Sequence, residues 1–131
     1  MIEEDILNKY HNIAVVGVSA NPRRPSCRVA EYLSRHGYNV IPVNPGVKEI
    51  LGKTSYPNLS SIPEPVDVVD IFRNPADIMP IIDEAIKIGA KAVWMQEGVI
   101  NEAAAAKARD AGLLVVMDKC MRKEHLRLIH Q

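Results

Sequence analysis

Five short apolar runs, rich in Val and Ile and mostly separated by stretches of helical character, constrain the fold of this 131-residue chain more than any other feature. Each run is bounded by Gly, Pro, Asn or Asp. Near-continuous apolar character indicates strands buried on both faces, as in a parallel sheet covered by helices. The predicted strands are residues 13–18, 40–43, 66–72, 92–95 and 113–117, and polar Asp67 and Asp70 interrupt the third.

Helical patterns occupy most of the intervals between these runs. Residues 26–36 place apolar side chains on one side before Gly37, and an alanine-rich stretch follows Asn101 as far as Ala111. An apolar stripe over residues 78–88 follows a helix-start signal at residues 74–77. Pro80 predicts either a kink in this helix or a later start with Asp77 as the cap.

Two terminal helices and one irregular connection complete the pattern. The first ten residues predict a helix with Ile2, Ile6 and Leu7 turned inward, and the basic tail after Asp118 predicts a short surface helix. Residues 44–65 are rich in proline and predict only a short helical turn near residues 59–62. A long irregular connection inside a compact domain is often functional.

This order of elements predicts an α/β fold: a Rossmann-like, doubly wound, parallel five-stranded sheet flanked by helices. We expect a single domain over residues 1–131, because the length is typical of one domain and no linker or repeat interrupts it. Ligands of such sheets bind outside the carboxyl ends of the strands. The loops that follow the strands are therefore where chemistry is expected.

Composition excludes several functions. Sixteen Lys and Arg balance sixteen Asp and Glu, and aromatic residues make up 5% of the chain, so a nucleic-acid partner is not expected. The N-terminus resembles no secretory signal and no apolar run is as long as a membrane span, so we expect a cytoplasmic protein with no membrane partner. The spacing of Cys27 and Cys120 suggests neither a disulfide framework nor a metal site.

The loop after the first strand is the first candidate site. It begins at Gly17, carries Arg23 and Arg24, and opens a helix, where backbone N–H groups attract phosphate. The alternative is a polar turn with solvated arginines. The loop has neither the G-x-G-x-x-G pattern nor the G-x-x-x-x-G-K-[ST] pattern, which disfavours ordinary NAD binding and nucleotide triphosphate hydrolysis.

Three further loops place polar groups at the same edge. After the second strand stands Asn44, where an NAD-binding domain has an acid, and the nearby Lys48 either meets a ribose phosphate or is simply exposed. After the third strand, Phe72 either packs against a flat base or belongs to the core, with Arg73 beside it. Gln96 and Glu97 follow the fourth strand, whose Trp94 we expect in the core.

Catalytic constellations are weak. None of His11, His36, His125 and His130 is expected at the carboxyl edge of the first four strands, and no Ser/His/Asp set is apparent. A neighbouring cation favours a reactive thiolate at Cys120, and a helix start favours one at Cys27, although a packed cysteine is the commoner case. We therefore assign no catalytic residue.

At these loops the sequence resembles the stand-alone CoA-binding domain proteins over residues 12–129. The matching segments are VVGVSANPRRPSCRVAEYL, HGYNVIPVNPG, LGKTSYPNLSSIPEPVDVVDIFRNP, GAKAVWMQEGVINEAAAAKARDAGL and VVMDKC. The chain is also similar to the N-terminal domain of the succinyl-CoA synthetase α subunit and of ADP-forming acyl-CoA synthetases. The resemblance implies a Rossmann-like domain that holds coenzyme A, or an acyl-CoA, by its ADP end.

The resemblance also implies a role for each loop. The diphosphate would lie on the loop that begins at Gly17, against Ser19, Ala20 and Asn21, with charge from Arg24. Val43, Asn44 and Pro45 would flank the adenosine, and Lys48 would meet the 3′-phosphate. Phe72 and Arg73 would border the nucleotide, and Gln96 and Glu97 would face the pantetheine arm. The synthetases have a Thr-Gly-Ser-Gln type of loop where this chain has Ser19-Ala20-Asn21-Pro22.

The expected function is therefore a CoA- or acyl-CoA-binding protein without catalysis of its own. The synthetases need a second domain with a phosphorylated histidine, for which this chain has no room. Three alternatives stay open: an NAD(P)-binding protein, a thiol-redox protein that forms a mixed disulfide between CoA and Cys27 or Cys120, and a subunit of an acyl-CoA-processing enzyme. The sequence predicts no particular protein partner.

Overall fold

In the computed structural model, which describes residues 1–130, the five predicted strands form one parallel sheet in the order β2-β1-β5-β6-β7. The chain winds from β1 out to β2 and then returns past β1 to β5, which is the doubly wound arrangement. The predicted Rossmann-like fold is thus confirmed. The strands are β1 (Asn12–Val16), β2 (Asn39–Val43), β5 (Val68–Ile71), β6 (Ala92–Met95) and β7 (Leu114–Val116).

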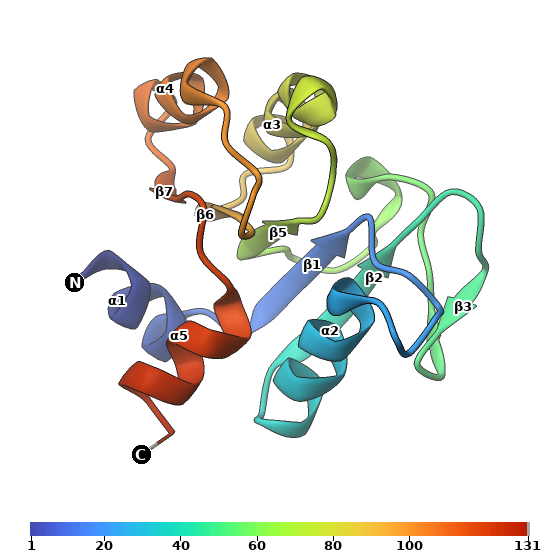
Figure 1. Ribbon diagram of the computed structural model, residues 1–131. Helices are drawn as coiled ribbons and strands as arrows, with labels where there is room; N and C mark the ends of the chain where they lie inside the picture. Colours follow the sequence, from blue (N-terminus) through green and yellow to red (C-terminus); the bar gives the residue numbers. More distant parts are fainter. Residues whose placement is uncertain (131) are drawn as a thin grey trace.

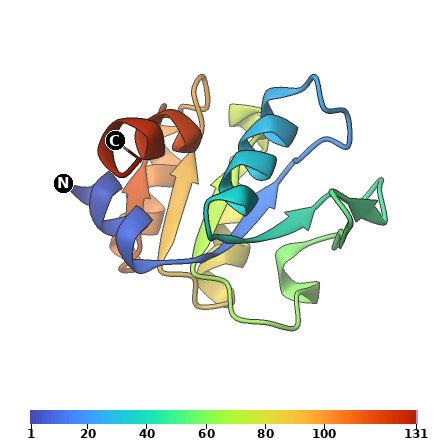
Figure 2. The ribbon, with the colours of Figure 1, turned by 90° about the horizontal axis from the view of Figure 1, so that it is seen from below.

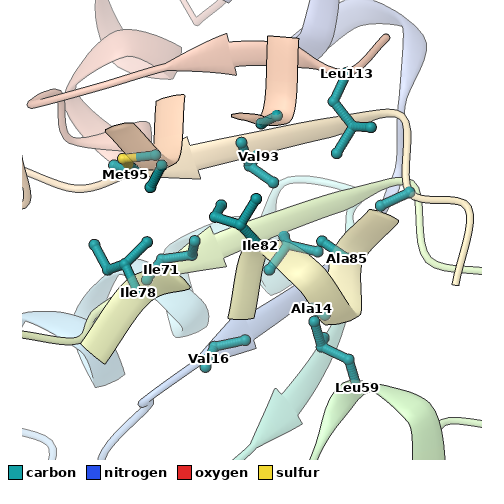
Figure 3. Packing of buried hydrophobic residues seen from close by; sticks show 14 of the residues in the cluster. Ala14, Val16, Leu59, Ile71, Ile78, Ile82, Ala85, Val93, Met95 and Leu113 are labelled. Carbon is teal, nitrogen blue, oxygen red and sulfur yellow. The ribbon is translucent and has the colours of Figure 1, made fainter. Parts of the chain in front are cut away.

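Five α-helices form layers on the two faces of the sheet (Figure 1). One face is covered by α3 (Ile78–Lys87) and α4 (Glu102–Asp110). The other is covered by α1 (Ile2–Lys9), α2 (Pro25–Arg35) and α5 (Met121–Leu128). Each face has its own apolar cluster, and Figure 3 shows the one beneath α3 and α4. Trp94 is fully buried in the other cluster, as predicted, and donates its indole N–H to the carbonyl of Lys119 at 2.9 Å.

Local signals explain how two of the helices begin. Asn101 caps α4, because its side-chain oxygen accepts a hydrogen bond from the backbone N–H of Ala104 at 3.0 Å. A short 3-10 turn, η2 (Pro75–Asp77), precedes α3, which begins after Asp77. Pro80 therefore falls in the first turn of α3, where its missing N–H costs nothing. Of the two outcomes predicted for Pro80, the later helix start is the one observed.

The terminal helices pack together on the second face. Ile6 and Leu7 of α1 are buried, but Ile2 is 44% exposed, so the prediction that Ile2 turns inward was wrong. Ile2 is the first residue of α1, next to the N-terminus, which lies at the outer margin of the fold (Figure 1). The predicted surface helix α5 buries Met121 and His125, and it packs against α1 and α2.

The connection over residues 44–65 contains an unpredicted hairpin beside edge strand β2 (Figure 2). Its strands are β3 (Glu49–Ile50) and β4 (Lys53–Thr54), and both turn residues, Leu51 and Gly52, have positive φ. Leucine is a poor signal for such a turn, which is why the sequence pattern did not predict it. The predicted helical turn is present as η1 (Leu59–Ser61), capped by the side chain of Asn58.

Among the helices of residues 1–130, none combines the length and the apolar character that a membrane-spanning helix needs.

Candidate ligand site at the carboxyl edge of the sheet

Gly17 forms the turn that follows β1. Its φ is +83°, and a Cβ atom at this position would overlap the carbonyl oxygen of Phe72. Its N–H donates to the carbonyl of Val43 at 3.0 Å, which ties the turn to the end of β2. A glycine is therefore required where the chain passes between the ends of β2 and β5.

The loop after Gly17 is held by a relay of side-chain oxygens. The hydroxyl of Ser26 accepts from the N–H of Ser19 at 2.9 Å, and the hydroxyl of Ser19 accepts from the N–H of Asn21 at 3.0 Å. The side-chain oxygen of Asn21 accepts from the N–H of Arg23 at 3.0 Å. A hydroxyl that accepts one hydrogen bond keeps its proton, and an amide keeps its NH₂ group. Ser19 and Asn21 therefore order the loop and still carry donors for a ligand.

The helix α2 starts directly behind this loop. Arg24 is its N-cap and Pro25 its first residue, and in the described chain the side chain of Arg24 makes no capping hydrogen bond. The N–H groups of Ser26 and Cys27 in the first turn have no intrahelical acceptor, as at any helix start. The positive end of the helix dipole and the Arg24 guanidinium together favour an anion at this point.

A cavity of about 550 Å³ opens beside this helix start. It is bounded by the turns after β1, β5 and β6, by the first two turns of α2, and by the residue that precedes α5. Six of the predicted site residues line it. The lining consists of Gly17, Ser19, Arg24, Pro25, Ser26, Val29, Phe72, Gln96, Glu97 and Cys120.

A second cavity, of about 190 Å³, lies on the other side of Gly17. Val43, Pro45 and Arg73 line it, together with residues of η1 and α3. The structure thus divides the predicted site into two groups that meet at Gly17. The other four predicted residues, Ala20, Asn21, Asn44 and Lys48, line neither of these two cavities.

Asn44 has a structural task that the sequence did not reveal. Its side-chain NH₂ donates to the carbonyl of Val18 at 2.9 Å, and its side-chain oxygen accepts from the N–H of Gly46 at 2.8 Å. Asn44 therefore ties the loop after β1 to the turn after β2. Lys48 is exposed, and its backbone carbonyl pairs with Ser55 of the same connection. Direct contact of either side chain with a ligand stays a prediction.

Gln96 is 3% exposed and reaches below the floor of the larger cavity. Its side-chain nitrogen donates to Oδ1 of Asp70 at 2.5 Å. Asp70 is fully buried, and burial raises the pKa of its carboxyl to about 7, against the opposing effect of the Gln96 hydrogen bond. Sequence reasoning did not assign Asp70 to the site; the signal was its interruption of an apolar strand.

The two thiols differ in their surroundings. Cys27 is buried, and burial raises the pKa of its thiol, with the charge of Glu31 acting in the same direction. Burial and Glu31 thus oppose the effect of the helix start, which favours a thiolate, and the reactivity of Cys27 stays a prediction. Cys120 is half-buried and lines the larger cavity.

Among the described residues, neither a metal-binding cluster nor a histidine belongs to the two cavities. Within residues 1–130, no group of three His, Cys, Asp or Glu side chains is arranged to hold a metal ion. The residues that line the two cavities include no histidine. His36 and His125 instead pack against Tyr32, whose hydroxyl hydrogen-bonds to Nδ1 of His125 at 2.8 Å, and the ring of His130 packs against both histidines.

A doubly wound parallel sheet with a glycine turn, a donor-rich loop and a cavity at its carboxyl edge defines a Rossmann-like ligand-binding domain. Comparison with known proteins identifies the kind of domain. The family model of the CoA-binding domain matches residues 11–126, and the chain belongs to this family.

Relatives include small proteins of similar length and one large enzyme. The uncharacterized protein YneT of Bacillus subtilis is 35% identical over 122 residues, covering 93% of this chain and 90% of YneT. A hypothetical protein from Pyrococcus horikoshii is 45% identical with a TM-score of 0.95, covering 97% of this chain and 89% of that one. An ADP-forming acetate–CoA ligase of Archaeoglobus fulgidus is 33% identical over 95 residues, which are 70% of this chain and 14% of the ligase.

Proposed function

We propose that this protein binds CoA or an acyl-CoA at the carboxyl edge of its sheet, and that it catalyses no reaction of its own. The observation that carries the proposal is the ordered loop from Gly17 to Arg24 beside a cavity of about 550 Å³. Ordered donors and a helix start form a ready receptor for a diphosphate. Membership of the CoA-binding domain family supports CoA as the molecule that carries it.

The two cavities on either side of Gly17 suit the two ends of such a ligand. The diphosphate would contact the Ser19 hydroxyl, the backbone N–H groups of the loop and the Arg24 guanidinium. The adenosine would extend toward Val43, Pro45 and Arg73, and the pantetheine arm would enter the larger cavity toward Gln96. Lys48 is the candidate for the 3′-phosphate, which it would reach from the connection after β2.

The side chains of the larger cavity support binding rather than catalysis. Its one carboxylate, Glu97, pairs with Lys123 at 3.0 Å, and its one thiol, Cys120, has no histidine beside it in the cavity lining. Nucleophilic catalysis usually needs a nucleophile within hydrogen-bonding reach of a base. The match to the ligase covers 14% of that enzyme, so its reaction is not assigned to this chain.

Calorimetric titration with CoA, dephospho-CoA, acetyl-CoA, NAD and ADP tests the proposal. We expect CoA and acetyl-CoA to bind, with CoA tighter than dephospho-CoA, and we expect Lys48→Ala to remove that preference. Binding of NAD without CoA, or binding of none of the five, would overturn the proposal. Incubation with acyl-CoA thioesters is expected to release no product, and turnover would contradict the non-catalytic role.

Arg24→Ala tests the phosphate site directly. Loss of a guanidinium from a phosphate contact should weaken CoA binding about tenfold or more, and the remaining affinity should depend less on salt. Arg35→Ala is the matched control, because Arg35 lies at the opposite end of the same helix and pairs with Glu31. Equal effects of the two substitutions would count against a phosphate site at the start of α2.

A second candidate function is favoured by the position of Cys120 in the larger cavity. The Cys120 thiolate would attack a CoA disulfide, form a mixed disulfide with one CoA, and release the other as a thiolate. Intact-mass spectrometry after treatment with CoA disulfide should then show one CoA adduct that is lost in Cys120→Ser. Absence of an adduct on the native protein would exclude this function.

A further inference from the structure

The floor of the larger cavity rests on a polar residue that does not line it. Gly17, Phe72 and Gln96 line the cavity directly after β1, β5 and β6. Two residues earlier in each strand stand Val15, Asp70 and Trp94, which are paired in register across the sheet. Side chains two residues apart point to the same face of a strand. Asp70 therefore lies one layer beneath the floor, between two apolar neighbours.

Asp70 determines which end of the Gln96 amide faces the ligand. A carboxylate only accepts hydrogen bonds, so the NH₂ group of Gln96 has to point toward Oδ1 of Asp70, 2.5 Å away. The amide oxygen of Gln96 is then left for the cavity that this residue lines. The second oxygen, Oδ2, is buried and has no hydrogen-bond partner in residues 1–130, so the Gln96 amide is the single recorded polar contact of this carboxyl.

Other charged groups near the floor are engaged elsewhere or lie in the layer above. Arg24, Glu97 and Cys120 line the cavity itself, and Glu97 is paired with Lys123. On the helices that cover this face, the inward-facing Tyr32 and His125 hydrogen-bond to each other. Burial and the Gln96 hydrogen bond are accordingly the causes that set the pKa of Asp70 near 7.

We propose that Asp70 is a positioning residue, whose carboxylate holds Gln96 with its carbonyl oxygen toward the cavity to accept a hydrogen bond from an N–H or S–H group of the pantetheine arm. The inference rests on the proposed function and names the chemistry of the subsite for the arm. Protonation of Asp70 supplies a donor to Gln96, so the amide can turn and present NH₂ to the ligand. Two donors then face each other, and the arm binds less tightly.

The test compares one ligand that carries the arm with one that lacks it. CoA and adenosine 3′,5′-bisphosphate are titrated by calorimetry at pH 5.5 and pH 8.5 into the native protein, Asp70→Asn and Asp67→Asn. Asp67 is the matched control, because it accepts from the N–H of Asn12 at the amino end of the sheet. The phosphates of each ligand ionise identically in all three experiments, so their titration cancels between proteins.

We expect the native protein and Asp67→Asn to gain about tenfold more affinity for CoA on going to pH 8.5 than Asp70→Asn does, as for one well-made hydrogen bond. The bisphosphate should show one pH profile with all three proteins. Gln96→Leu should weaken the binding of CoA at pH 8.5 and leave the affinity for the bisphosphate unchanged. Acetyl-CoA shows which group donates, because it keeps the N–H groups of the arm and has no S–H. If an N–H group donates, acetyl-CoA should show the same pH dependence as CoA; if the thiol donates, it should show none of it.

Two outcomes would overturn the inference. In one, the affinity of Asp70→Asn for CoA depends on pH as that of the native protein does. In the other, Asp70→Asn changes the pH dependence of the affinity for the bisphosphate as much as that for CoA. If the native protein binds neither ligand, the proposed function itself has failed, which is a distinct result. The side-chain amide resonances of Gln96 provide a readout without ligand: they should titrate in the native protein and stay constant in Asp70→Asn. Gln96→Leu keeps the inference testable if Asp70→Asn does not fold.

Discussion

The two faces of the sheet are built differently. The face beneath α3 and α4 is closed by aliphatic side chains and Met95 (Figure 3). The helix α4 contributes Ala104, Ala105 and Ala108, which are all fully buried. The face beneath α1, α2 and α5 buries Trp94 and several aliphatic residues, but it also contains Ser26, Asp70, Gln96 and His125. The larger cavity opens on this second face.

This difference shows where the fold gives up stability for a binding site. Small side chains on α4 let the helix pack closely on the sheet and exclude water, so that no polar side chain of the described residues is buried unpaired there. Burying a carboxyl in an apolar layer is unfavourable unless it is neutral or well hydrogen-bonded. Asp70 has one recorded hydrogen bond and lies directly under the cavity, so its cost to the fold is consistent with a role in the site.

Gly17→Ala should damage both faces, because Gly17 borders both cavities and a Cβ would overlap the carbonyl of Phe72. We expect a loss of more than about 4 kcal/mol in the free energy of unfolding, measured by denaturant titration. Gly37→Ala is the control: Gly37 also has positive φ, at +92°, but a Cβ there meets nothing within 4 Å. It should cost about 1–2 kcal/mol. Similar losses in both variants would contradict the close approach at Gly17.

Asp70→Asn should remove a pH dependence of the free energy of unfolding that comes from the buried carboxyl on the second face. The folded-state pKa of about 7 lies above the ordinary 3.8, so the folded protein holds a proton that the unfolded chain has released. The native protein should therefore lose stability as the pH rises from 4 through 7, by up to about 4 kcal/mol. Denaturation at pH 5 and pH 8 should show this loss in the native protein and in Asp67→Asn, and its absence in Asp70→Asn. An unchanged pH slope in Asp70→Asn would exclude a perturbed carboxyl at this position.

Ile82→Ala probes the apolar cluster beneath α3, at a residue that lines neither of the two cavities. Ile82 is fully buried on α3, so its truncation should cost about 3 kcal/mol while leaving the affinity for CoA unchanged. Val29→Ala is the counterpart on α2, where the side chain lines the larger cavity. It should cost about 1 kcal/mol and also change the affinity. If Ile82→Ala weakens CoA binding as much as Val29→Ala does, the effect of Val29 on affinity does not come from its place in the lining of the larger cavity.

His125 gives the second face an opposite response to pH. Burial, followed by the neighbouring His36 and His130, lowers the pKa of His125 below its ordinary 6.5. The unfolded chain therefore takes up a proton first as the pH falls, and stability should decrease below pH 6.5. His125→Phe should remove this decrease and should lose about 1 kcal/mol at pH 8 with the Tyr32 hydrogen bond. His11→Phe, at an exposed histidine that stacks on Tyr38, should retain the native acid response.

Several features of the site were predictable because they depend on neighbours in the chain. Gly17 and the helix start at Pro25 follow from the order of residues after an apolar run, and so do the polar groups at Gln96 and Glu97. Three predicted strands were too long: the first at residues 17–18, the third at residues 66–67 and 72, and the fifth at residues 113 and 117, because apolar residues continue beyond the paired residues. The sequence pattern reflects hydrophobicity, whereas the end of a strand is set by where its backbone hydrogen bonds to the neighbouring strand end.

Other features depended on residues that are distant in the chain. Asp70 and Gln96 are 26 positions apart, and Asn44 and Val18 are also 26 apart, so no local pattern links either pair. The burial of Cys27, which raises the pKa of its thiol, follows from the packing of α2 against the sheet. The cover that α5 provides over the second face depends on its contacts with α1 and α2.

The residue pattern alone was enough to predict the α/β class, the doubly wound sheet and the edge at which a ligand is expected. These follow from the periodicity of apolar residues and from the right-handed crossover rule, both of which are properties of local chain geometry. The folded structure was needed to see which predicted residues share a cavity, which of them hold loops together, and that a buried carboxyl lies beneath the cavity floor. The physical reason is that burial and hydrogen bonding between distant strands set the charge, orientation and access of a side chain, and the order of residues alone does not specify them.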